Sequence, residues 1–277
     1  MGLLAAPDQI SSPQGSSREY WRETRRPFCN LVFLLPFLLI YEFGVHCATS
    51  PRGMSVRNGA DAWMRVWLHQ TGLEIAWMPP ILLLAALLVW QLKSRQPWNM
   101  TWDTLGGMAA ESLLYAFVLI MLGQLTDFSF RHAPWARMQV DESVASTGFL
   151  VRIVSFMGAG IYEEFLFRLC LVPLTYVVFR GLLIPKNWSI AGTVVTTSLI
   201  FSLAHYLGPS ANGHALAMLT DAAVRVQSSR ELWFGFCFRT LAGMFFALLY
   251  FLRGFGITVG AHATYDVFVG VVLIGEL

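Results

Sequence analysis

The chain has 277 residues, of which 56% are hydrophobic and 13% are charged. Soluble domains have about 45–50% apolar and about 25% charged residues, so this composition excludes an ordinary water-soluble domain and also a disordered chain. The net charge of +2 gives no electrostatic basis for binding nucleic acid, so we expect no nucleic-acid partner. Because one spanning helix needs about 20 residues, we predict an all-α, polytopic transmembrane helix bundle of about seven spans, within a range of about six to eight.

Residues 1–27 are polar and end in a basic cluster, and we predict a flexible cytoplasmic tail there. Residues 28–277 are predicted to form a single transmembrane domain. Long apolar runs predict spanning helices at 28–47, 76–92, about 105–126, about 148–179, 189–207, 232–252 and 256–275. Segments 58–72 and 214–227 are amphipathic and typical of helices in the membrane interface. The basic cluster favours an integral protein of the plasma (inner) membrane with its N-terminus in the cytoplasm.

Ionisable residues inside predicted spans are costly, so each of them is a candidate functional residue. The set contains four acids, three arginines and two histidines: Glu111, Glu163, Glu164, Asp266, Arg152, Arg168, Arg239, His205 and His262. Full pairing of acids with arginines would leave one carboxylate to be protonated, hydrated or bound to a metal. We expect Glu111, Arg152 and Arg239 to form structural ion pairs between helices.

The first candidate group is Glu163-Glu164-Phe-Leu-Phe-Arg168. Glu164 and Arg168 are four residues apart, so they can pair on one helix face. Glu163 is turned about 100° from Glu164 by the helix geometry and can face another partner. Because two neighbouring carboxylates in a low dielectric resist joint ionisation, Glu163 is suited to act as a general base or acid.

The second and third groups are Phe201-x-x-x-His205 and His262-x-x-x-Asp266. His262 and Asp266 share a helix face, so Asp266 can accept a hydrogen bond from the imidazole and fix its tautomer. A single histidine in an apolar run is commonly a packed core residue. Two histidines, together with an adjacent glutamate pair, indicate a chemical site.

These groups, in this order on separate apolar segments, resemble the CPBP family of CAAX-processing and bacteriocin-processing intramembrane endopeptidases. The family pattern is E-E-x-x-x-R, then F-x-x-x-H, then H-x-x-x-N or H-x-x-x-D, and it places a catalytic core at about residues 150–270. The resemblance implies an intramembrane peptidase that acts on a membrane-tethered protein or peptide. Eukaryotic members of this family remove the last three residues of prenylated CAAX proteins.

The resemblance also implies roles for the site residues. Glu163 and His205 would activate a water, and His262 would hold the oxyanion. Arg168 would position Glu164. An ionised Asp266 cannot donate to an oxyanion, so an orienting role toward His262 fits it better.

Other mechanisms and functions stay open at this point. Glu163, His205 and His262 match the ligand set of a catalytic zinc ion, although no H-E-x-x-H motif is present. We favour the metal-free, glutamate-dependent mechanism with no cofactor. A proton-coupled transporter also uses buried acids and histidines, and an inactive membrane scaffold is a third alternative. Paired halves with matched broken helices, which many transporters have, are not recognisable in the sequence.

A count of helical rise gives one difficulty for a shared site. From the start of its predicted span, His205 lies about 24 Å along the helix, and His262 lies about 9 Å along its own. If both helices run in one direction, the two depths differ by about 15 Å. Convergence then requires a strong tilt, a turn of Gly254-Phe255-Gly256 deep inside a cavity, or different span boundaries.

Overall fold

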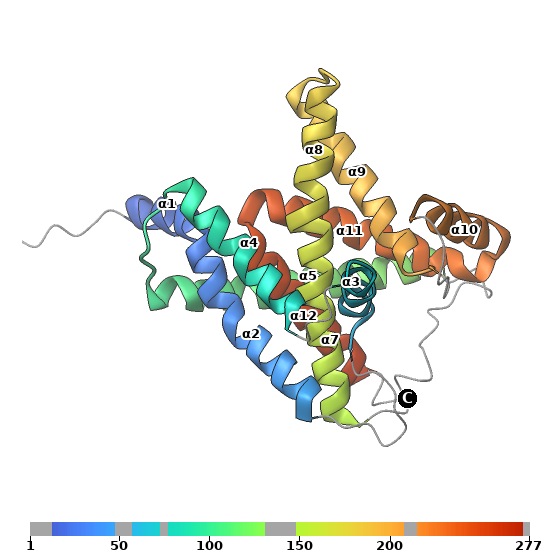
Figure 1. Cartoon of the computed structure of the whole chain (residues 1–277), viewed down its shortest axis with the longest axis horizontal. Helices are drawn as coiled ribbons and strands as arrows, with labels where there is room; N and C mark the ends of the chain where they lie inside the picture. The colour runs from blue at the N-terminus through green and yellow to red at the C-terminus, as the bar shows by residue number, and fades with distance from the viewer. Residues whose placement is uncertain (1–12, 48–56, 73–76, 131–147, 208–214, 274–277) are drawn as a thin grey trace, which may run out of the picture.

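The computed structural model describes residues 13–47, 57–72, 77–130, 148–207 and 215–273 (Figure 1). Every regular element in these ranges is a helix, so the prediction of an all-α bundle is confirmed. In chain order the helices are α1 (Pro13–Glu23), α2 (Pro27–Cys47), α3 (Gly59–Gln70), α4 (Met78–Ser94), α5 (Trp102–Phe130), α7 (Phe149–Glu164), η1 (Phe165–Leu171), α8 (Val172–Gly181), α9 (Lys186–Ala204), α10 (Ala215–Ser228), η2 (Arg230–Leu232), α11 (Trp233–Arg253), α12 (Phe255–Val267) and η3 (Phe268–Leu273).

Each predicted apolar run overlaps at least one of these helices, and both predicted amphipathic segments are helical, as α3 and α10. By length and composition, four helices among the described residues can cross a membrane: α2, α5, α9 and the stretch 230–253. Helix α4 is apolar but shorter, with 17 residues. The other apolar runs are divided between shorter helical elements, of which α7, η1 and α8 follow one another directly.

The segment predicted to be a flexible tail is partly helical and packed against the bundle. Glu23 at the end of α1 is buried and accepts hydrogen bonds from the Thr104 hydroxyl at 2.6 Å and from the Thr101 backbone N–H at 3.1 Å. The Arg25 side chain donates from Nε to the Leu252 carbonyl at 3.0 Å. These bonds tie the segment to α5 and α11, so the structure corrects the prediction of flexibility for residues 13–26. Residues 1–12 lie outside the described residues.

Helices α7, η1 and α8 form one uninterrupted helical run, whose upper part pairs with α9 and extends beyond the other helices (Figure 1). Pro173 lies at the start of α8, inside this run. Proline has no backbone N–H and crowds the carbonyl four residues earlier. In the structure the turn before Pro173 opens into the π-helix η1, and the helix continues as α8. Such π segments are frequent at functional sites.

Helix α12 lies in the centre of the bundle, packed by α2, α5, α7 and α11. Its apolar side chains from Phe255 to Ala263 are almost completely inaccessible. The backbones of α7 and α12 are in close contact at Gly160. A Cβ atom added to this glycine would lie only 2.5 Å from the backbone nitrogen of Ala263. Small residues allow this kind of approach between membrane helices. The contact lies about one turn from the glutamate pair on α7 and next to His262 on α12.

The same arrangement removes the difference in depth that the sequence suggested. Helix α9 begins at the tip of the α8–α9 hairpin, beyond the ends of the central helices (Figure 1). Counting from its first residue therefore overestimates how deep His205 lies relative to His262. The starts of the spans therefore do not share one plane, and depths counted from them cannot be compared directly.

Candidate active site

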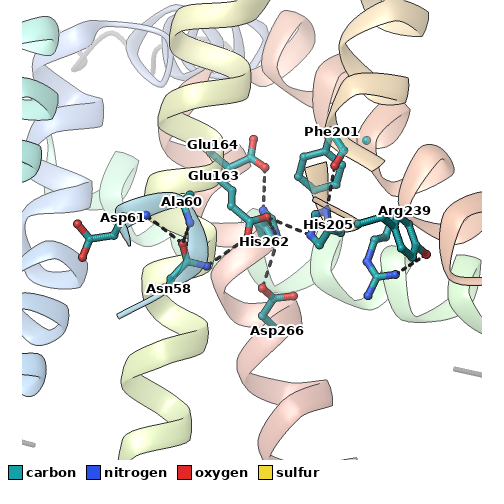
Figure 2. A network of polar contacts seen from close by, with 12 residues as sticks. Asn58, Ala60, Asp61, Glu163, Glu164, Phe201, His205, Arg239, His262 and Asp266 are labelled. Atoms are coloured by element: carbon teal, nitrogen blue, oxygen red, sulfur yellow. Dashed lines mark hydrogen bonds and ion pairs between the residues drawn. The ribbon is translucent and has the colours of Figure 1, made fainter. Parts of the chain in front are cut away.

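The three predicted groups lie together where α7, the C-terminal end of α9 and α12 meet (Figure 2). Glu163 is at the centre of this cluster. Its Oε2 atom lies 3.7 Å from Nε2 of His205 and 4.0 Å from Nε2 of His262. Three helices that are distant in the sequence thus direct one carboxylate oxygen and two imidazole nitrogens at the same point.

His262 is held by carboxylates on both ring nitrogens. Its Nδ1 lies 2.7 Å from Oε1 of Glu164, and its Nε2 lies 3.3 Å from Oδ2 of Asp266. Phe246 of α11 stacks on the ring, with centroids 4.4 Å apart and planes 21° apart. Carboxylates only accept hydrogen bonds when ionised, so a ring that serves both of them carries two N–H protons. The predicted contact with Asp266 exists, but the shorter contact is with Glu164.

Glu164 is fixed in turn by Arg168, the i+4 pair predicted from the sequence. Nε of Arg168 lies 3.1 Å from Oε2 of Glu164, and both side chains are almost completely buried. Arg168 also donates to the Gly243 carbonyl at 3.2 Å, and its guanidinium lies over the Phe201 ring, 4.4 Å from the centroid. The pair therefore forms the closed floor of the cluster, and Glu164 connects it to His262.

His205 is the C-cap residue of α9, and its Nε2 faces the same oxygen of Glu163 as Nε2 of His262 does. Its Nδ1 lies 2.9 Å from the Phe201 carbonyl, which can only accept, so Nδ1 carries the proton and donates. Its Nε2 then has a free lone pair toward Glu163. The Phe201 ring also packs between His205 and Arg168, which explains the four-residue spacing of the F-x-x-x-H motif.

Accessibility divides the cluster into a closed floor and an open side. The side chains of His205 and Glu163 are 27% and 13% exposed, whereas that of His262 is 6% exposed. The 3.7 Å between Glu163 and His205 is too long for a direct hydrogen bond and is a separation at which a water can contact both. The open side of the cluster can thus admit water.

Of the remaining intramembrane charges, Arg239 lies beside His205 (Figure 2). Glu111 forms the expected structural ion pair, and its partner is Arg253 at the end of α11. Nη2 of Arg253 lies 2.5 Å from Oε1 of Glu111, and Nε lies 2.6 Å from Oε2. Arg239 donates to the Tyr206 hydroxyl at 2.9 Å instead of pairing with an acid, and no ion pair joins Arg152 to another described residue. The expectation of ion pairs is therefore confirmed for Glu111 alone. Arg239 contacts a phenol, and Arg152 contacts no described carboxylate.

Two residues of the cluster were not identified from the sequence. Asn58, immediately before α3, donates from Nδ2 to Oε1 of Glu163 at 3.2 Å (Figure 2). Phe246 covers one face of His262. An asparagine that precedes an amphipathic run is a recognisable helix cap, but its spacing does not indicate a partner more than a hundred residues away.

The donor set suits zinc in chemical type, whereas its geometry does not fit a three-ligand site. Both nitrogens of His262 already face carboxylate oxygens, which leaves that ring without a free lone pair. Within the described ranges, no three His, Cys, Asp or Glu side chains are arranged to hold a metal ion. His205 alone presents an unprotonated nitrogen to the open side.

Comparison with known proteins gives one match. Residues 145–268 match the family described as "Type II CAAX prenyl endopeptidase Rce1-like". The matched segment contains the whole glutamate pair and both histidine motifs, but not Asn58. No curated protein and no solved structure matches the chain. Residues 145–268 are therefore similar to the CAAX prenyl endopeptidases, which are proteases.

Proposed function

We propose that the protein hydrolyses a peptide bond of a membrane-tethered protein or peptide, with Glu163 as the general base. The observation that supports this proposal is the convergence of Oε2 of Glu163 with the two histidine nitrogens at distances that fit a bound water. The closed pair of Glu164 and Arg168 behind them supports a rigid, pre-arranged site.

In the proposed reaction, a water lies between Glu163 and His205. Glu163 takes one of its protons, and the water oxygen forms a bond to the carbonyl carbon of the scissile peptide. The carbonyl oxygen becomes an oxyanion, which the N–H of His262 Nε2 stabilises. The C–N bond then breaks, and the proton held by Glu163 passes to the leaving amine, so that the site returns to its starting state.

His262 can serve the oxyanion only if its ring is held still and protonated. The 2.7 Å contact with Glu164 supplies this support, and Arg168 holds Glu164 in place. Asp266 shares Nε2 of His262 with the incoming oxyanion. We therefore propose that Asp266 accepts the hydrogen bond from Nε2 of His262 in the resting state. As the oxyanion forms, this N–H donates to the oxyanion instead.

Metal dependence is tested with purified protein and a farnesylated peptide that ends in a CAAX sequence, presented in lipid vesicles. In the metal-free mechanism, turnover should be unchanged by a strong chelator, because every step uses side chains and water alone. Loss of turnover on chelation that zinc restores, together with stoichiometric zinc in the active protein, would contradict the metal-free mechanism and leave the peptidase assignment intact. The same assay with an unprenylated peptide shows whether the lipid anchor is required.

The substitution Asp266→Asn separates the two mechanisms by a second route. In the metal-free mechanism the asparagine amide can donate to the oxyanion, so turnover should stay near the wild-type value or rise. In a zinc mechanism, loss of a carboxylate that supports a ligand histidine should cost about 10–100-fold in metal affinity or activity. A fall of that size that tracks bound zinc would favour the metal site.

We also propose that the protein lies in the plasma (inner) membrane with its N-terminus in the cytoplasm. The basic residues on and after α1 support this orientation, because positive charge before a first span is retained on the cytoplasmic side. An epitope tag at the N-terminus should resist protease added to intact cells and be cut after lysis. Cutting in intact cells would show the opposite orientation.

A further inference from the structure

Asn58 makes two kinds of hydrogen bond with its one side-chain amide. As the N-cap of α3, its Oδ1 accepts from the backbone N–H groups of Ala60 at 2.7 Å and Asp61 at 3.4 Å. Its Nδ2 donates to Oε1 of Glu163 at 3.2 Å (Figure 2). One amide thus joins the start of α3 to the carboxylate at the centre of the active site.

The capping bonds decide which end of the amide reaches Glu163. A backbone N–H can only donate, so the atom that caps α3 must be the oxygen, and the atom that faces Glu163 must be the NH₂ group. The Oε1 atom of Glu163 is therefore an acceptor. This bond leaves Oε2 as the oxygen directed at His205 and His262, where a proton has to be taken from water.

Helix α3 is anchored firmly enough to hold this geometry. Asp61, with no exposed surface, accepts from the Tyr41 hydroxyl at 2.9 Å, Arg57 Nη1 at 2.7 Å and Arg65 Nε at 2.8 Å. Tyr41 belongs to α2, so the network crosses from one helix to another. Trp63 on the next turn packs against the apolar cluster formed by Phe167, Phe201 and Ala204, beside His205.

We propose that Asn58 is a positioning residue for Glu163, supplied by α3 from outside the segment 145–268 that matches the protease family. It fixes the rotation of the carboxylate and so selects the oxygen that acts as base. The inference rests on the proposed function, because it assigns a purpose to the orientation of Glu163. It also gives the N-terminal half of the chain a part in the chemistry.

Two substitutions keep the helix cap and remove the Nδ2 amide that reaches Glu163. Serine and aspartate are both good N-caps, so Asn58→Ser and Asn58→Asp should melt close to the wild-type temperature. Asn58→Ser should lower kcat about 10-fold with little change in KM, which corresponds to loss of about one hydrogen bond to a charged group. Asn58→Asp should lower kcat further, because it places a second carboxylate against Glu163.

The control is Thr71→Ala at the other end of α3, where the hydroxyl bonds only the Leu68 carbonyl. It perturbs the helix without touching the active site, so kcat should stay at the wild-type value. If Glu163→Gln is inactive while both Asn58 variants keep wild-type kcat, Asn58 is a helix cap alone and the inference is overturned. If the wild-type protein and Glu163→Gln cleave the farnesylated peptide equally, the proposed function fails, and the inference fails with it.

Discussion

Glu163→Gln should lower kcat by about 100-fold or more, because glutamine keeps the size and one acceptor of glutamate but cannot take a proton from water. The melting temperature should stay near the wild-type value. Glutamine can still accept the hydrogen bond from Asn58, and Glu163 has no arginine partner that the substitution would leave unpaired. Turnover of the vesicle-bound farnesylated peptide, measured beside thermal melting in the same detergent, gives both quantities.

The matched control for this variant is Glu111→Gln. Glu111 is also an intramembrane glutamate, but it forms a bidentate ion pair with Arg253 at some distance from the cluster. Its substitution should lower stability and leave the turnover of the folded fraction unchanged. Wild-type turnover in Glu163→Gln would remove Glu163 as the base, whatever the stability of the protein.

Arg168→Ala should lower the free energy of unfolding by about 3–5 kcal/mol, the usual cost of removing one partner of a buried ion pair. Glu164 has no exposed surface, so water cannot replace the guanidinium. The substitution also removes the contact with Gly243 and the packing over Phe201. We expect weak expression, a lower melting temperature and loss of turnover, since Glu164 would no longer hold His262.

A double substitution separates charge from packing in this effect. Arg168→Met combined with Glu164→Gln leaves no unpaired buried charge, and an amide oxygen can still accept from Nδ1 of His262. The melting temperature should recover most of the loss, as replacement of complete buried ion pairs by neutral groups is often tolerated. If Arg168→Ala melts like the wild type, the pair does not stabilise the fold, and its role as the floor of the site is wrong.

The all-helical membrane class of the protein and most residues of the candidate site could be predicted from the sequence alone. Apolar runs of spanning length are a direct consequence of the bilayer's thickness, so they indicate helices whatever the tertiary structure is. The pair of Glu164 and Arg168 follows from helical spacing, which is local. Both histidine motifs also lie within single helical turns, and for this reason their internal contacts were predictable.

Contacts between helices were not predictable, since they depend on which helix surfaces meet. Spacing linked His262 to Asp266, whereas the packing of α7 on α12 at Gly160 gives it the shorter contact with Glu164. Arg253 lies at the end of a predicted span, and only the fold places it on Glu111. The predicted tail likewise packs on the bundle because a buried carboxylate, Glu23, finds threonine partners on α5.

By itself, therefore, the sequence determined an all-helical membrane protein with a glutamate pair, an arginine and two histidines on defined helix faces, because those features depend on hydrophobicity and local spacing. Tertiary structure decided the depth at which the histidines meet, since α9 starts beyond the ends of the central helices. It also decided which oxygen of Glu163 faces them. That choice comes from Asn58, whose amide is oriented by capping a helix from the other half of the chain.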